Sequence, residues 1–113
     1  MALSPAGSKA LLAQVAVCEV TGVKLAVLCG GERGDRKASF ARQIAMYLCR
    51  MVFAMTLSEV AESFGRDRTT AAHAVARIEE AREEPEFDRA VTRLEGVLRR
   101  LVREIEWPES EHA

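Results

Sequence analysis

The stretch from Thr56 to Thr70, TLSEVAESFGRDRTT, decides the fold. It opens on a Thr-x-x-Glu pattern, in which the Thr56 hydroxyl accepts from the amide of Glu59 and the Glu59 carboxylate reaches back to the amide of Thr56. This capping box predicts a helix that begins at Leu57. The helix is expected to last about two turns, because Gly65 ends it and the polar residues after Gly65 carry no apolar stripe.

A second helix is expected to follow at once, over residues 69–82. This segment is rich in alanine, and Ala71, Ala74 or Val75, and Ile78 follow helical spacing. Two short helices joined by a glycine-containing turn form a helix-turn-helix. In such a motif the first residues of the second helix reach base edges in the major groove, while the first helix crosses the phosphate backbone.

The segments on both sides are also helical in pattern, because apolar residues recur every three or four positions and β-branched alternation is scarce. The expected elements are helices over residues 8–21, 23–28 and 39–52, a loop over 29–37, and a last helix from Pro85 to a stop at Trp107 and Pro108. Ser8 and Ser39 are the expected caps of the two long upstream helices.

Length and composition agree with one small domain. The chain has 113 residues, of which 49% are apolar and 29% are charged, as in ordinary globular domains. The fold class predicted is all-α, a compact helical bundle, with a flexible N-terminus over residues 1–7, the domain over 8–106 and a flexible acidic tail over 107–113. No apolar stretch has the length and lack of charge of a membrane span. Three cysteines without metal-binding spacing favour a reduced, cytoplasmic protein.

Three strings make the helix-turn-helix more specific. They are Arg42-Gln43-Ile44-Ala45-Met46-Tyr47-Leu48, the run from Leu57 to Thr70, and His73-Ala74 followed by Ile78-Glu79. Together they resemble the C-terminal DNA-binding domain of the bacterial replication initiator DnaA, over roughly residues 11–105. The resemblance implies a Trp-repressor-like helical fold that binds double-stranded DNA.

The expected contacts with DNA come from the motif and from this resemblance. An arginine can bond guanine with both arms of its guanidinium, an aspartate can accept from cytosine, and a threonine can meet phosphate or the thymine methyl group. The family's Arg-Asp-His-Thr-Thr motif maps to residues 66–70, and the resemblance places Arg42 near DNA and one of three loop cations in the minor groove. The full expected set is Arg33, Arg36, Lys37, Arg42, Arg50, Arg66, Asp67, Arg68, Thr69, Thr70, His73 and Arg77. A simpler alternative is that Asp67 only caps the helix, that the arginines are solvated and that His73 is structural.

Two departures from the family pattern concern specificity. The family has two glycines before Arg-Asp, whereas only Gly65 stands here, so the turn is expected to be one residue tighter. Arg68 replaces the family's histidine with a longer cation that can prefer guanine or phosphate. We therefore predict altered or relaxed specificity relative to the initiator's box.

No catalytic residue, cofactor, nucleotide site or metal site is predicted. The run Cys29–Gly34 contains three glycines, but no Gly-Lys-Ser or Gly-Lys-Thr follows, so it is interpreted as a loop rather than a phosphate-binding loop. The cysteines are expected to be small core residues. A DNA reader without the ATPase module of the DnaA family is expected to regulate rather than to unwind an origin.

The last helix has two interpretations. Its apolar residues over 91–105 are expected to close the bundle, as the corresponding helix does in the family. The alternative is that this helix pairs with a second copy or with another protein.

The net charge of −1 hides an asymmetry along the chain. Residues 33–77 carry eight basic and four acidic side chains, a net of +4, whereas residues 78–113 carry six basic and eleven acidic ones, a net of −5. The basic part is the expected DNA reader, and the acidic part should weaken non-specific binding. The function predicted is a nucleoid-associated transcriptional regulator. The alternatives are a competitor of the initiator for its boxes and a protein-interaction module.

Overall fold

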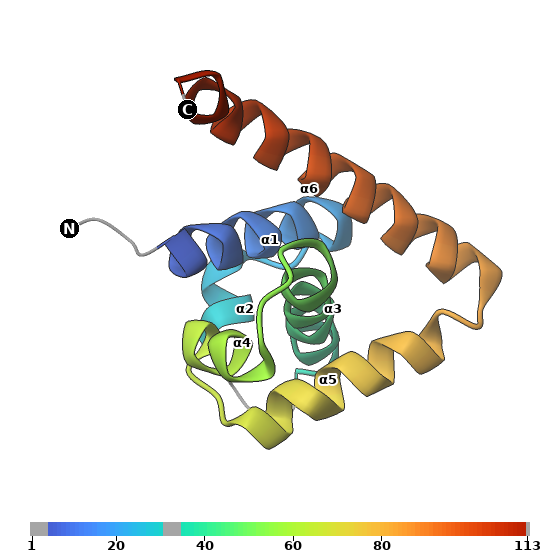
Figure 1. The fold of residues 1–113 in the computed structure, drawn as a ribbon. Helices are drawn as coiled ribbons and strands as arrows, with labels where there is room; N and C mark the ends of the chain where they lie inside the picture. The colour runs from blue at the N-terminus through green and yellow to red at the C-terminus, as the bar shows by residue number, and fades with distance from the viewer. Residues whose placement is uncertain (1–4, 31–34, 113) are drawn as a thin grey trace.

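Six α-helices make up the part of the chain that this computed structural model describes, residues 5–30 and 35–112 (Figure 1). They are α1 (Pro5–Thr21), α2 (Leu25–Gly30), α3 (Arg36–Val52), α4 (Leu57–Phe64), α5 (Arg68–Ala81) and α6 (Pro85–His112). The predicted all-α fold class is confirmed. In Figure 1, α3 is seen nearly end-on between α1 above it and α5 below it.

The core is centred on α3. Its residues Ile44, Ala45 and Leu48 are at most 4% exposed, since helical spacing places them on the faces that neighbouring helices cover. α1 packs on one side and α5 on the other. The buried residues of α5 include Ala71 and Ala74, whose short side chains let two helices approach closely. α5 is therefore seated on the core by one face and leaves the other face free.

Local caps define the helix-turn-helix formed by α4 and α5. The Thr56 hydroxyl accepts from the amide of Glu59 at 3.0 Å, and the Glu59 carboxylate accepts from the amide of Thr56 at 2.8 Å, which confirms the predicted capping box. α4 ends at Gly65, whose φ of +64° is a left-handed conformation that glycine adopts without strain. The amide of Arg66 donates back to the carbonyl of Ala61 at 2.8 Å, and this closes the turn.

Two upstream helices begin earlier than predicted. α1 begins at Pro5 rather than after Ser8, because the fixed φ of proline suits the first position of a helix. α3 begins at Arg36 rather than after Ser39, because the Asp35 carboxylate accepts from the amide of Ala38 at 3.0 Å and so caps the helix.

The predicted loop over residues 29–37 is correspondingly shorter. Cys29 and Gly30 belong to α2, and Arg36 and Lys37 belong to the first turn of α3. Residues 31–34 lie outside the described residues. α5 also begins one residue earlier than predicted, at Arg68, because Asp67 is its cap.

α6 closes the bundle with its first half. The Glu84 carboxylate accepts from the amides of Glu86 and Phe87 and so caps the start of the helix. Further along α6, Val91, Leu94 and Leu98 are buried, which confirms that this part of the stripe closes the core, whereas Leu101 and Val102 are only half-buried.

The predicted stop at Trp107 and Pro108 is wrong, because α6 continues to His112. The backbone of residues 107–112 is thus helical. A proline removes one amide donor from a helix, but its φ is compatible with helical backbone, so the chain beyond it can stay helical.

Candidate nucleic-acid interface

The first turns of α5 present an exposed polar surface. The exposed residues there are Arg68, Thr69, Thr70 and His73. Thr69 and His73 are one helical turn apart and share a face. Ala71 and Ala74 occupy the opposite side and are buried. The structure therefore brings four of the predicted contact residues together at one end of α5.

Asp67 stands at the entrance to this surface and caps α5. Its Oδ1 accepts from the amide of Thr70 at 2.7 Å. The hydrogen bonds from Thr70, first its amide and then its side chain, hold the pKa of Asp67 below its ordinary value, and the amide of Thr69 and the charge of His73 act in the same direction. The capping role weighed as the simpler alternative is thus present, and a base contact by Asp67 stays a prediction.

Arg42 and Arg66 bring two positive charges together beside the turn. The Arg42 Nε donates to the carbonyl oxygen of Leu28 at 2.8 Å, and both arginines are half-buried. Burial lowers the pKa of Arg42, and the positive charge of Arg66 lowers it further. Neither guanidinium forms an ion pair with a residue in the described ranges 5–30 and 35–112. This pair can therefore attract an anion such as a backbone phosphate.

The basic residues that lead into α3 are exposed. Arg36 and Lys37 lie in its first turn, immediately after the Asp35 cap. Their backbone is helical and not a flexible arm, so any reach toward a groove comes from the long side chains alone. Arg33, the third candidate for the minor groove, lies outside the described residues.

Arg50 and Arg77 have partners within the protein. The Arg50 Nη1 donates to the carbonyl oxygen of Met55 at 2.8 Å, across the turn in which Ala54 adopts a φ of +54°. The Arg77 guanidinium lies over the ring of Phe40, 5.4 Å from its centre. Both side chains are exposed, so these contacts do not bury them, and their roles toward DNA stay predictions.

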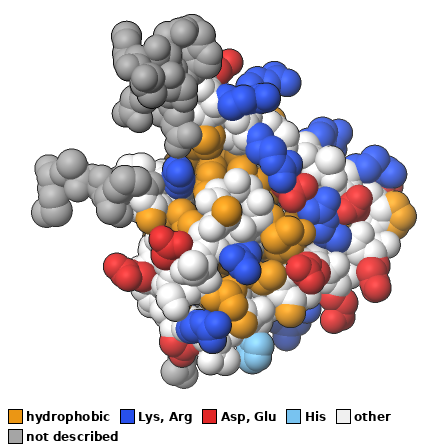
Figure 2. Space-filling view, in the orientation of Figure 1, with side chains coloured by type: hydrophobic (Ala, Val, Ile, Leu, Met, Phe, Trp, Pro, Cys, Tyr) orange, Lys and Arg blue, Asp and Glu red, His pale blue; other side chains and the backbone are white. Residues whose placement is uncertain are grey.

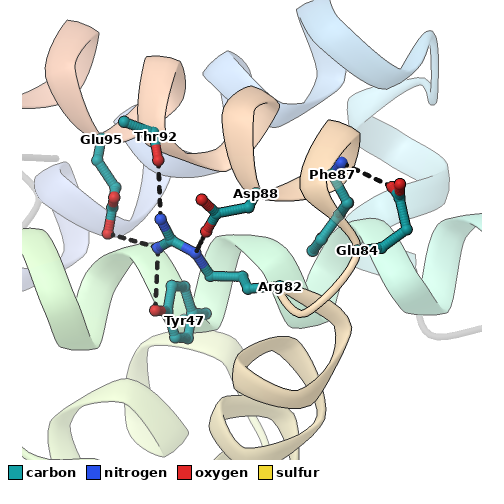
Figure 3. A network of polar contacts seen from close by, with 7 residues as sticks. All are labelled: Tyr47, Arg82, Glu84, Phe87, Asp88, Thr92 and Glu95. Carbon is teal, nitrogen blue, oxygen red and sulfur yellow. Dashed lines mark hydrogen bonds and ion pairs between the residues drawn. The ribbon is translucent and has the colours of Figure 1, made fainter.

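Sequence reasoning missed a network around Arg82, at the end of α5 (Figure 3). Its guanidinium bonds to Asp88, Thr92 and Glu95 of α6 and to the Tyr47 hydroxyl of α3. One feature of the sequence pointed to this network. Glu95 lies four residues after Val91, on the apolar stripe of the last helix, and a carboxylate at such a position requires a partner inside the protein.

Charge is distributed unevenly over the surface. In Figure 2, acidic side chains gather on the right, where α5 leads into α6, together with several basic ones. This is the end of α5 opposite to its exposed polar surface. A polyanion would therefore meet the first turns of α5 at lower electrostatic cost than the turn between α5 and α6.

Two of the thiols, those of Cys18 and Cys49, do not resemble activated nucleophiles. Burial raises the pKa of Cys49 to about 12. Burial also raises the pKa of Cys18, and the neighbouring Cys29 and Glu19 add to the effect. Cys49 is buried as expected, but Cys18 is only half-buried and Cys29 is exposed. Within the described ranges, no three His, Cys, Asp or Glu residues are grouped so that they could hold a metal ion.

No helix in the described part of the chain combines the length and apolar character needed to cross a membrane.

Comparisons with known proteins point to one family. The family model described as bacterial dnaA protein helix-turn-helix matches residues 12–78. The chromosomal replication initiator protein DnaA of Aquifex aeolicus is 43% identical over 68 residues, which are 59% of this chain and 16% of that protein. DnaA of Zymomonas mobilis is 40% identical over 70 residues, which are 61% of this chain and 14% of that protein.

Solved structures agree with the sequence matches. A DNA replication initiation factor superimposes with a TM-score of 0.74 at 33% identity, covering 83% of this chain and 29% of that one. Replication initiator DnaA bound to AMPPCP and single-stranded DNA gives a TM-score of 0.71 at 33% identity, covering 83% of this chain and 28% of that one. The chain thus spans only a small part of the length of each relative.

Proposed function

Because the chain belongs to the family of the bacterial DnaA helix-turn-helix, we propose that it binds double-stranded DNA sequence-specifically and acts as a transcriptional regulator without catalysis. Family and geometry support binding of double-stranded DNA. Such a role places the protein at the nucleoid in the cytoplasm.

The free first turns of α5 are the observation that carries the proposal. The N-terminal end of α5, which we call its reading end, is exposed at Arg68, Thr69, Thr70 and His73. The opposite face of α5 packs on the core. The helix N-terminus adds a positive dipole, which favours phosphate. A structural element that faces solvent in this way is available to a DNA groove without any rearrangement of the core.

Within this surface we assign two kinds of contact. Arg68 and Thr69 lie at the start of α5 and reach base edges, with His73 one turn further along. Arg42 and Arg66 bind phosphates beside the turn, because they are two neighbouring cations that form no ion pair within the described residues. Arg36 and Lys37 approach the backbone or the minor groove from the first turn of α3.

A replication role is the second candidate, since the relatives that match are replication initiators. A protein bearing only this reading surface would compete with an initiator for shared sites. Both roles require sequence-specific binding and differ only in where the sites lie on the chromosome.

A protein-interaction role through residues 91–105 is supported less well. Val91, Leu94 and Leu98 are buried in the protein's own core and are not available to a partner. Val97 is 50% exposed, but its neighbours on the outer face of α6 are mostly charged. Sedimentation of the free protein tests this alternative, since a stable dimer would support it.

The proposal is tested by selecting the duplexes that the protein binds and then mapping its sites along the chromosome. The purified chain is incubated with a pool of random duplexes, bound duplexes are amplified over several rounds, and the enriched sequence is compared with the starting pool. Enrichment of one motif supports sequence-specific binding, and a pool that stays random contradicts it. Mapping of the protein along the chromosome then separates promoters, which the transcriptional role predicts, from replication origins.

A further inference from the structure

We infer that Arg82 is a positioning residue for DNA recognition, which sets the tilt of α5 without touching DNA. The inference rests on the proposed function, since it concerns how the reading end of α5 is held. Arg82 lies at the other end of that helix, where it is the C-cap.

The Arg82 side chain lies between α5 and α6, two helices that diverge from their connecting turn. In Figure 1, α5 and α6 leave their connecting turn in different directions, with α3 between them. The acceptors that Arg82 meets on α6 are Asp88, Thr92 and Glu95, which are spaced by four and three residues and so lie on one face over successive turns. The side chain thus joins the end of α5 to α6 along about two turns of that helix.

The same guanidinium is also tied to α3. Its Nη1 donates to the Tyr47 hydroxyl at 3.1 Å, and the guanidinium lies 5.7 Å from the centre of the Tyr47 ring (Figure 3). Tyr47 is 4% exposed and belongs to the central helix. Arg82 therefore fixes the end of α5 relative to both α3 and α6.

All three nitrogens of the guanidinium are engaged. Nε donates to Asp88 at 2.6 Å, Nη2 donates to Thr92 at 2.9 Å, and Nη1 lies 3.1 Å from Glu95. The Arg82 side chain is only 19% exposed and that of Glu95 is 11% exposed. Desolvation alone would lower the pKa of Arg82, but the hydrogen bonds to Asp88, Glu95 and Tyr47 outweigh it and raise the pKa. A guanidinium held in this way is committed to the protein and not to a phosphate.

The length of α5 explains why the orientation of its C-terminal end, at Arg82, affects the position of its N-terminal end, near Arg68. Its 14 residues span about 20 Å, so a small change of tilt at Arg82 displaces the side chains near Arg68. Hydrogen bonds to base edges weaken steeply with distance and angle. Attraction to phosphates is long-ranged and tolerates such a shift. Loss of the network should therefore reduce discrimination between sequences more than it reduces binding to DNA in general.

The experiment compares three variants on two duplexes, one selected by the wild type from a random pool and one of unrelated sequence. Arg82→Lys keeps the charge but cannot present the planar fork of donors that meets these acceptors. Tyr47→Phe removes only one acceptor of the network. Leu98→Val is the control, because it weakens packing at a buried position of α6 whose side chain takes no part in the Arg82 network.

Dissociation constants are measured at a temperature at which urea unfolding shows every variant to be fully folded. For Arg82→Lys we expect the affinity for the selected duplex to fall by about tenfold, the size of one impaired base contact, with the unrelated duplex nearly unchanged. Tyr47→Phe should show the same pattern with a smaller loss. Leu98→Val should lose stability and keep the wild-type ratio of the two affinities.

Other outcomes overturn the inference in distinguishable ways. If Arg82→Lys, Leu98→Val and the wild type all show the same ratio of affinities for the selected and the unrelated duplex, Arg82 has only a structural role. A fourth variant, Arg82→Met, removes the charge, and equal losses on both duplexes in this variant, with a shallower salt dependence, would make Arg82 a phosphate contact. A wild type that does not distinguish the duplexes at all would contradict the proposed function, and the positioning role with it.

Discussion

Arg42 donates from Nε to the carbonyl oxygen of Leu28 at 2.8 Å, so a residue expected to approach DNA also ties α2 to α3. The two roles use different atoms. The tie occupies Nε, while the positive charge is shared over the whole guanidinium and lies close enough to Arg66 to lower the pKa of Arg42. A DNA phosphate placed between the two arginines would relieve their mutual repulsion.

Substitution of Arg42 separates these roles. Arg42→Ala should weaken binding to selected and unrelated duplexes by similar factors and should reduce the slope of log affinity against log salt by about one, as expected for a lost phosphate contact. Arg42→Lys keeps the charge but loses the hydrogen bond from Nε to the carbonyl of Leu28. Most of the dependence of affinity on salt should therefore remain. Binding titrations at several salt concentrations measure both effects, and a selective loss on one sequence would instead indicate a base contact.

Arg68 and Lys37 should behave differently when each is replaced by alanine. Arg68→Ala is expected to cost about 1–3 kcal/mol on the selected duplex and little on unrelated DNA, because a base contact carries sequence information. Lys37→Ala should weaken both duplexes about equally, since Lys37 is exposed in the first turn of α3 and meets backbone phosphate. Competition binding with both duplexes checks this pair, and equal losses for Arg68→Ala would make it a phosphate contact as well.

Gly65 is required by the turn between α4 and α5. Its φ is +64°, and an added Cβ would meet no atom within 4 Å, so the cost of Gly65→Ala is backbone strain alone. We expect a loss of about 1 kcal/mol in the free energy of unfolding.

Gly96→Ala is the matched control for that variant. Gly96 is an exposed residue of α6, and the added methyl group also meets nothing within 4 Å. Since alanine is the better helix former, this change should stabilise the protein by up to about 1 kcal/mol. Urea unfolding measures both variants, and a change of the same sign in each would show that the φ of Gly65 is not the cause.

Asp67 should make the stability of the protein depend on acid pH. Hydrogen bonds hold its pKa in the folded chain below the ordinary value of 3.8. The unfolded chain therefore binds this proton more readily, so the stabilisation is fully present above about pH 5 and is lost as pH falls through the folded pKa. Asp67→Asn retains a capping residue but has no such titration.

Urea unfolding of the two proteins between about pH 6 and pH 2 tests this dependence. The wild type should lose more stability than Asp67→Asn over the acid part of that range. Identical pH profiles would mean that the cap at Asp67 does not stabilise the fold through its charge.

Much of the reading surface was predictable, because its structure is local. The capping box at Thr56 and Glu59 and the glycine at position 65 act over three or four residues. The caps at Asp35 and Asp67 are equally local, but Ser39 and Thr69 offered competing starts, so the helix boundaries were misplaced by a few residues. The end of α6 was misjudged for a related reason, since a proline weakens a helix without always ending it.

The sequence by itself determined that this protein contains a helix-turn-helix with basic residues at its reading end, because caps, turns and helical periodicity involve neighbours along the chain. Only the tertiary structure decided which cations face solvent and which are committed to the protein. Arg42 reaches Leu28 over 14 positions, and Arg82 reaches Tyr47 over 35. Such partners are set by the packing of α3 against α2, α5 and α6, and packing brings together residues whose separation in sequence carries no periodic signal.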